Sequence, residues 1–146
     1  MAIQPGRIRP LALCVIWRGD DLLVFEGHDR VKRSTFYRLL GGGIEFGEYG
    51  HQAVVRELRE ELGAELVDLR SVGTLENIFT FEGEMGHEIA QVYEARFADP
   101  TLYERDEMVA YEDDGTSLRV RWMPLAGLRA GQTPLYPEGL LALLDR

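Results

Sequence analysis

The chain is poor in cysteine and histidine, which restricts its redox and metal chemistry. Of its 146 residues, one is cysteine and three are histidine. A single cysteine excludes an intramolecular disulfide, and Cys14 stands within the apolar run 11–16, so we expect a buried structural thiol and a reducing, cytoplasmic location. His28, His51 and His87 are too scattered to match the ligand spacing of a zinc site.

Long hydrophobic runs and an excess of positive charge are also absent. No segment reaches the roughly 18 apolar residues of a membrane-spanning helix, and residues 1–10 lack the apolar core of a signal peptide. We therefore expect a cytoplasmic protein that does not enter a membrane. Lys and Arg number 16 against 25 acidic residues, which gives a net charge of −9. This balance argues against binding of long nucleic acids and favours small phosphorylated ligands, with a metal supplying positive charge.

The size and composition of the chain fit one compact domain. A chain of 146 residues can bury roughly two thirds of the surface that its unfolded form exposes. Apolar residues make up 45% and charged residues 28%, both near the averages of globular proteins. We predict a single domain over residues 1–146, without long disordered segments.

The hydrophobic pattern predicts a mixed α/β fold, in which a mixed sheet is covered by helices on two sides. The strands expected are 11–17, 22–25, 36–40, 75–81, 88–97 and 118–123, and the helices expected are 49–62 and 137–144. Residues 27–34 are polar and are predicted to form an exposed loop. Its three cations, Arg30, Lys32 and Arg33, either meet substrate phosphates or are merely solvated.

The predicted helix 49–62 carries three carboxylates on one side. Glu57, Glu60 and Glu61 fall within about 100 degrees of arc on a helical projection. Carboxylates three and four residues apart repel one another, and although Arg56 can reach Glu60, Glu57 and Glu61 have no obvious cation in register. A divalent cation would relieve the repulsion, because Mg²⁺ binds oxygen ligands, both from carboxylates and from substrate phosphates. The alternative is an ordinary amphipathic helix with a solvated charged side. The apolar side of the helix is predicted to consist of Val55, Leu58 and Leu62.

The spacing around these acids resembles the Nudix box. Gly42 is followed after five residues by Glu48, and after seven more by the stretch 56–63, which reads RELREELG. Chance agreement at these positions is on the order of one in a million or rarer at average residue frequencies. The chain departs from the family pattern at Leu40, where proline often precedes the glycines, and at Ala64, where a larger aliphatic residue usually closes the box. Neither departure removes a ligand, so the chain is identified as a MutT-like member of the Nudix hydrolases.

The resemblance implies a fold and a metal site. The fold is the Nudix α/β/α sandwich, with a mixed sheet between helices. The carbonyl of Gly42 and the carboxylates of Glu57, Glu60 and Glu61 are expected to hold Mg²⁺ or Mn²⁺, and the glycines 41–43 are expected to form a turn that approaches the ligand closely.

The resemblance also implies catalytic roles. Glu48 and Arg56 are expected to orient the helix and its loop. The general base is expected either in the box or, as in some relatives, in a later loop, where the acidic stretches are 103–108 and 112–114. Of these later acids we favour Glu107. The catalytic residues expected are Glu48, Arg56, Glu57, Glu60 and Glu107.

The reaction implied by the family is metal-dependent hydrolysis of the pyrophosphate bond in a nucleoside diphosphate linked to another group. Residues 79–82 lack the proline and the tyrosine that mark some branches, which favours nucleoside triphosphates or nucleotide sugars as substrates. The partner expected is therefore a small phosphorylated nucleotide, and a homodimer is compatible with the family. The alternative function is a nucleotide-sensing or partner-binding module that keeps the fold without catalysis.

Overall fold

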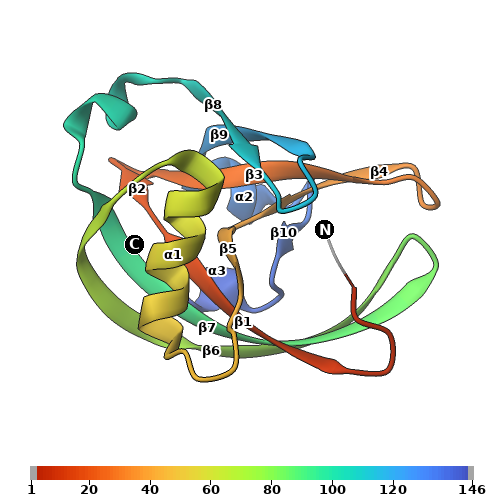
Figure 1. Ribbon diagram of the computed structural model, residues 1–146. Coiled ribbons are helices and arrows are strands. Elements are labelled where there is room, and N and C mark those ends of the chain that lie inside the picture. The colour runs from red at the N-terminus through yellow and green to blue at the C-terminus, as the bar shows by residue number, and fades with distance from the viewer. Residues whose placement is uncertain (1–2, 145–146) are drawn as a thin grey trace.

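The computed structural model describes residues 3–144, in which ten strands form two sheets accompanied by three α-helices (Figure 1). The strands are β1 (Ile8–Val15), β2 (Trp17–Arg18), β3 (Asp21–Asp29), β4 (Ser34–Arg38), β5 (Leu40–Gly43), β6 (Leu66–Phe81), β7 (Glu84–Phe97), β8 (Glu107–Tyr111), β9 (Ser117–Pro124) and β10 (Leu135–Tyr136). The helices are α1 (Gly50–Leu62), α2 (Leu125–Ala130) and α3 (Leu140–Leu143), and a 3-10 turn, η1, spans Pro100–Glu104.

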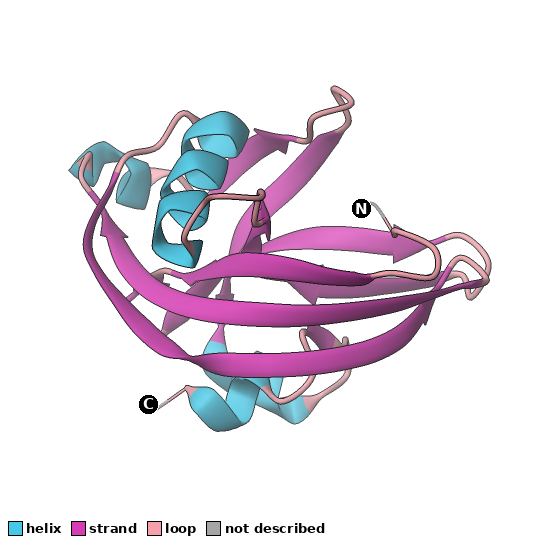
Figure 2. Cartoon of the chain, turned by 60° about the horizontal axis from the view of Figure 1, so that its bottom comes forward, coloured by secondary structure: helices cyan, strands magenta, loops and turns pink. Residues whose placement is uncertain are grey.

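Both sheets mix parallel and antiparallel pairs. The first has the order β5-β1-β7-β6, in which β1 runs parallel to β7 and antiparallel to β5. The second has the order β10-β4-β3-β9-β8, with β2 also paired to β3 and with β10 parallel to β4. The long strands β6 and β7 form a hairpin that curves beneath β1 (Figure 2).

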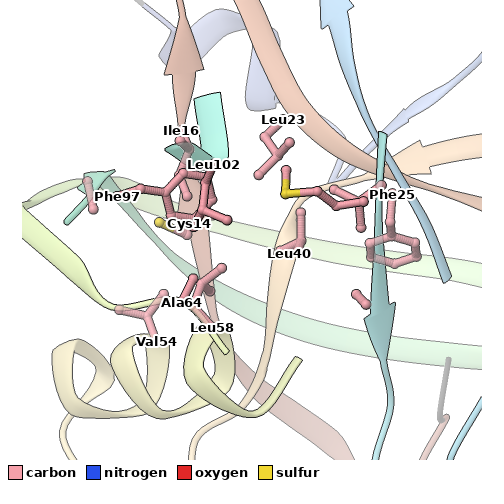
Figure 3. Close-up of a cluster of buried hydrophobic side chains, with 14 of the residues drawn as sticks. Cys14, Ile16, Leu23, Phe25, Leu40, Val54, Leu58, Ala64, Phe97 and Leu102 are labelled. Atoms are coloured by element: carbon pink, nitrogen blue, oxygen red, sulfur yellow. The ribbon is translucent and has the colours of Figure 1, made fainter. Parts of the chain in front are cut away.

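The hydrophobic core has two parts, one on each side of the central strands. Ala12 and Cys14 of β1 pack in the cluster that α1 covers, while Leu11 and Leu13 pack in the cluster that contains residues of α2 and α3. Figure 3 shows the first cluster, where Cys14 lies among the side chains over α1. Cys14 is buried as predicted. Since residues 11–15 of β1 are buried on both faces, they form a continuous apolar run without alternation.

The helices lie on opposite sides of the strands, with α1 on one side and α2 and α3 on the other (Figure 2). The predicted α/β fold is therefore confirmed, with the strands divided between two sheets. No helix within residues 3–144 is both long and apolar enough to cross a membrane.

The segment predicted as an exposed loop at 27–34 is largely ordered by hydrogen bonds. Strand β3 continues to Asp29, whose buried carboxylate accepts hydrogen bonds from the backbone N–H groups of Val31, Lys32 and Glu82. The Nζ of Lys32 donates to the carbonyl of Thr80 at 2.8 Å, and Arg30 forms an ion pair with Glu82 at 2.7 Å. Two of the three cations thus bind the β6–β7 hairpin.

The structure also extends and adds elements. The predicted strands 75–81 and 88–97 are longer in the structure. Strand β6 already begins at Leu66. Strand β7 begins at Glu84, because the turn before it is only Glu82 and Gly83, both with positive φ as a two-residue hairpin turn requires. The C-terminal helix begins at Leu140 and not at 137, since Gly139 at its N-cap has a φ of 87°. Strands β8 and β10 and helix α2 were not predicted. The expected turn at 41–43 is wrong, because these glycines belong to strand β5 and pair with β1.

Candidate active site

Helix α1 carries most of the predicted site residues and has well-defined ends. The backbone N–H of Tyr49, its N-cap, donates to the side-chain oxygen of Gln52 at 2.9 Å. At the other end, Gly63 adopts the left-handed conformation, with a φ of 65°, and its N–H donates to the carbonyl of Arg59 at 2.9 Å. The predicted helix 49–62 is confirmed to within one residue.

Arg56 joins the helix to the strand and loop that precede it. Its Nε and Nη2 donate to the two carboxylate oxygens of Glu48 at 2.8 and 2.9 Å, and Nη2 also donates to the carbonyl of Gly43 at 2.9 Å. Its Nη1 donates to Glu57 at 2.9 Å and to Glu60 at 3.2 Å. The bidentate bond with Arg56 lowers the pKa of Glu48 to about 2, and the same bond raises the pKa of Arg56.

The acidic side of α1 is partly an interior surface. Glu57 and Glu61 are only 9% and 7% exposed, whereas the Glu60 side chain is 45% exposed. Of the apolar side expected from the sequence, only Leu58 is fully buried, and the other buried apolar residues of the helix are Ala53 and Val54. The expectation that Glu57 lacks a cation is wrong, because the guanidinium of the adjacent residue, Arg56, donates a hydrogen bond to its carboxylate. Glu61 accepts a hydrogen bond from the backbone N–H of Gly41 at 3.1 Å.

Burial and mutual repulsion shift both interior carboxyls in the same direction. Burial raises the pKa of Glu61 to about 8, and the negative charges of Glu57, Glu112 and Asp113 contribute, against the hydrogen bond from Gly41. Burial also raises the pKa of Glu57, although Arg56 opposes the shift. These two carboxyls are therefore held in positions that disfavour their charged forms.

The glycines of β5 bring backbone close to these acids. Gly41 has a φ of 138°, and a Cβ there would lie 2.1 Å from the carbonyl oxygen of Ala12. A Cβ on Gly42 would lie 2.4 Å from the carboxyl carbon of Glu57, so that only glycine leaves this carboxylate in place. A Cβ on Gly43 would make only an ordinary van der Waals contact, because its nearest neighbour, the Nη2 of Arg9, lies 3.5 Å away.

A cavity of about 200 Å³ opens beside α1, between the two sheets. Its acidic side comes from α1 and from the β8–β9 turn, and its basic side comes from β1 and β4. The lining residues are Arg9, Leu11, Leu13, Phe25, Arg38, Leu39, Gly41, Gly42, Glu57, Glu61, Glu112, Asp113 and Asp114.

The structure separates the acids that were expected to act together. Glu57 and Glu61 line the cavity, whereas Glu48 and Glu60 are not among its lining residues and form ion pairs with Arg56. Glu107 does not line the cavity: it lies on β8, paired with Arg119. The acidic turn 112–114, considered less favourably from the sequence, does line it.

The donor set suits a hard divalent cation, because carboxylates and a backbone carbonyl offer oxygen ligands. Within residues 3–144, no three acidic, histidine or cysteine side chains already converge on one point, and Arg56 engages both Glu57 and Glu60. Two buried carboxyls with raised pKa at one cavity nevertheless form a site that positive charge would stabilise.

Two arginines at the cavity were missed by sequence reasoning. Arg38 directly precedes the Leu39–Leu40 pair, and Arg9 lies at the start of β1. No spacing rule marks either residue, since their position depends on how the two sheets approach each other.

Comparison with known proteins identifies related chains. A family model described as the NUDIX domain matches residues 7–143. The crystal structure of a MutT NUDIX hydrolase from Burkholderia pseudomallei is similar, with a TM-score of 0.66, 25% identity and coverage of 94% of this chain and 97% of that one. A NUDIX hydrolase from Nitrosomonas europaea has a TM-score of 0.66 at 18% identity, covering 94% and 86% of the two chains, which is a likeness of fold.

Curated relatives match a shorter stretch. The NAD-capped RNA hydrolase NudC of Pseudomonas aeruginosa (strain LESB58) is 37% identical over 71 residues, which is 49% of this chain and 25% of that protein. NudC of Vibrio vulnificus (strain CMCP6) is 32% identical over 81 residues, covering 51% and 31%. The matches thus span only about a quarter to a third of the curated relatives' length.

The raised pKa of Glu61 predicts how the stability of the metal-free protein depends on pH. The carboxyl has a pKa of about 8 when folded against an ordinary value of 4.5, so its protonated form stabilises the fold fully below about pH 4.5. That contribution, up to about 5 kcal/mol, is lost as pH rises toward 8. Glu61→Gln should therefore match the wild type near pH 5 and be more stable at pH 8. Urea unfolding in EDTA measures this, and a difference that stays constant with pH would contradict it.

Proposed function

The chain belongs to the Nudix family, and we propose that it hydrolyses the pyrophosphate bond of a nucleoside diphosphate linked to another group, using Mg²⁺ or Mn²⁺. The observation that carries this proposal is that Glu57 and Glu61, four residues apart on α1, are both buried at one cavity. Two buried carboxyls of like charge destabilise the metal-free fold, and a hard cation shared with substrate phosphates offsets that cost.

The proposed ligands are the carbonyl of Gly42 and the carboxylates of Glu57, Glu60 and Glu61. When bound, the metal supplies positive charge to the phosphate oxygens and acidifies or orients the attacking water. Arg56 fixes the ligand-bearing helix against Gly43 of the adjoining strand, through the 2.9 Å bond to its carbonyl.

An acid must also accept a proton from the attacking water. Glu57 and Glu60 are candidates within the box. Glu107, favoured from the sequence, is paired with Arg119 away from the cavity, and that pairing lowers the pKa of Glu107. We therefore transfer the role of the later acid to Asp113, which lines the cavity beside Glu57 and Glu61.

The substrate class proposed is a small nucleotide, with nucleoside triphosphates and nucleotide sugars favoured by the absent branch markers at 79–82. The curated relatives are named for NAD-capped RNA, so NAD and a NAD-capped oligonucleotide belong in the same panel. The net charge of −9 favours the small ligands over the RNA.

The alternative is a sensing or partner-binding module without catalysis. Retention of Glu57, Glu60 and Glu61 with their Arg56 partner favours the enzyme, because a module that only binds has no need of this acidic site. Incubation of the substrate panel with Mg²⁺ or Mn²⁺, followed by identification of products, decides between them. Product release supports the enzyme, and saturable binding without product supports the module. A cytoplasmic location and a homodimer stay predictions, the latter to be tested by sedimentation.

Removing charge from the box acids should abolish turnover without unfolding the protein. We expect Glu60→Gln and Glu61→Gln each to lower kcat by at least about a hundredfold, as loss of a metal ligand typically does to transition-state stabilisation. Glu65→Gln is the matched control, because Glu65 forms an exposed pair with Arg59 just beyond the helix. Unchanged turnover in the two box variants would refute the proposal.

The position of Gly42 predicts that a single methyl group disturbs the site. In Gly42→Ala, the new Cβ would displace the Glu57 carboxylate, so we expect turnover to fall at least about tenfold. The free energy of unfolding should change by less than about 1 kcal/mol, since Gly42 does not have a positive φ. Gly43→Ala adds the same methyl group in ordinary contact and should keep its activity. Equal activities in the two variants would contradict the role of Gly42.

The two candidate acids beyond the box, Glu107 on β8 and Asp113 in the β8–β9 turn, can be separated directly. Asp113→Asn should lower kcat by at least about tenfold, within the range of general-base contributions. Glu107→Gln should leave kcat within about twofold, because Glu107 meets Arg119 and not the cavity. A larger loss of kcat in Glu107→Gln than in Asp113→Asn, measured with the same substrate and metal, would instead assign the role of the base to Glu107.

A further inference from the structure

Helix α1 packs against the first sheet along one side (Figure 1). Near its C-terminal end, Glu61 accepts the backbone N–H of Gly41 at 3.1 Å. One turn earlier, Glu57 lies against Gly42 of the same strand. Gly50, the first residue of the helix, precedes Glu57 by seven residues, which is nearly two full turns. Gly50 therefore faces the sheet from the same side of the helix as the two buried carboxyls.

The N-terminal end of α1 approaches strand β7 as closely as its middle approaches β5. A Cβ on Gly50 would lie 2.4 Å from the hydroxyl oxygen of Tyr93 and 2.3 Å from the Oε1 of Gln91. These two atoms are hydrogen-bonded to each other, since the hydroxyl of Tyr93 donates to the Oε1 of Gln91 at 2.8 Å. Both distances are too short for a real contact of a Cβ. A side chain at position 50 would therefore displace either the helix or these groups.

The two obstacles differ in how readily they can move. Gln91 is exposed, so the end of its side chain can rotate into solvent. Tyr93 is only 9% exposed, and its ring belongs to the hydrophobic cluster that α1 covers. Its strand is paired on both sides, with Cys14 of β1 and Ser71 of β6 opposite Tyr93. The Tyr93 hydroxyl is thus a fixed surface beneath the start of the helix.

The backbone conformation does not require glycine at this position. Gly50 does not have a positive φ, in contrast to Gly47 in the preceding loop, where φ is 84°. Glycine also has one of the lowest helix propensities, and the cap of this helix is formed by Tyr49 and Gln52. The lack of space above Tyr93 therefore accounts for the glycine.

The consequence for the site follows from the length of the helix. Lengthening the contact with Tyr93 from 2.4 Å to an ordinary 3.4 Å requires a shift of about 1 Å at the start of α1. If the bond between Glu61 and Gly41 acts as a pivot, about 0.4 Å of this shift is transmitted to Glu57, since a helix rises about 1.5 Å per residue. A translation of the whole helix would transmit all of it. Shifts of this size are sufficient to lower turnover.

We propose that Gly50 is a positioning residue for the hydrolysis, because the absence of a side chain lets α1 pack directly on the Tyr93 hydroxyl. At that distance from the sheet, Arg56 bonds to the carbonyl of Gly43 at 2.9 Å, and Glu57 lines the cavity. Strand β7, which carries no residue of the box, thereby sets the height of the box helix above β5. This inference rests on the proposed hydrolase function and adds to it a residue that binds neither metal nor substrate.

The test adds one methyl group at Gly50 and then removes the obstacle beneath it. Gly50→Ala should lower kcat at least about fivefold with KM within about threefold, because the box acids move while other contacts to the substrate stay. In a Tyr93→Phe background the same substitution should lower kcat less than about threefold, since the clashing hydroxyl is gone and Gln91 can turn away. A Gly50→Ala variant within about twofold of the wild type, or an equal loss in both backgrounds, would overturn the inference.

Metal affinity separates positioning from a loss of stability. Calorimetric titration of Mn²⁺ into folded Gly50→Ala should give an affinity at least about threefold below that of the wild type, because the Glu57 carboxylate is displaced. A merely destabilised protein, measured while it is folded, would keep the affinity of the wild type, and that result would contradict the inference.

The matched control is Gly127→Ala. It adds the same methyl group to helix α2, where nothing lies within 4 Å of the new Cβ and φ is not positive. This variant should keep the kcat and the Mn²⁺ affinity of the wild type. Losses as large as those of Gly50→Ala would show a general effect of an added methyl group and would overturn the inference.

The double variant keeps the inference falsifiable if Gly50→Ala alone does not fold. Gly50→Ala/Tyr93→Phe should fold and turn over within about threefold of Tyr93→Phe. If the double variant also fails to fold, or is slower than this, the hydroxyl is not the obstacle and the inference is overturned. Absence of product from the wild type with every compound of the panel would instead count against the proposed function, and the Mn²⁺ titrations would still decide the role of Gly50.

Discussion

The guanidinium of Arg56 is the group on which the arrangement of the site depends. It bonds at once to the carbonyl of Gly43, to both oxygens of Glu48, and to Glu57 and Glu60. A hydrogen bond to a charged group contributes roughly 1.5–3 kcal/mol to stability where it is shielded from solvent, and less at the exposed Glu60. Together these bonds fix the helix against the strand and loop before it. Because one cation serves three carboxylates, the acidic side of the helix is held in place without being neutralised.

The fold accepts an unfavourable local arrangement at this point. Glu57 and Glu61 are buried with raised pKa, which destabilises the charged, metal-free site. The two apolar clusters on either side of the central strands supply the stability that allows it. Locally unfavourable burial of charged groups inside a well-packed fold is typical of functional sites. Here the two buried carboxyls also form the acidic side of the cavity. The opposite side of the cavity carries Arg9 and Arg38, and Arg38 forms an ion pair with Glu88.

Sequence reasoning succeeded where the signal was local. Helix 49–62 was predicted to within one residue because its apolar period and its terminal Gly63 depend on neighbours along the chain. It failed where side-chain position depends on distant strands: the glycines 41–43 form a strand because β1 pairs with them. Glu107 was favoured over 112–114 because nothing in the sequence gives the register of β8 on β9, which turns Glu107 toward Arg119. The same holds for Arg38, which lies at the cavity only because the two sheets approach each other there.

Above all, we propose that the buried carboxylates of α1 bind a divalent metal ion. Calorimetric titration of Mn²⁺ into the wild type, with a non-hydrolysable diphosphate present, tests it most directly, alongside Glu57→Gln and Glu61→Gln. We predict a saturable site in the wild type whose affinity falls at least about tenfold in each variant, as expected when an anionic oxygen ligand is replaced by an amide. Absence of Mn²⁺ binding to the folded wild type, or an affinity in both variants equal to that of the wild type, would contradict it.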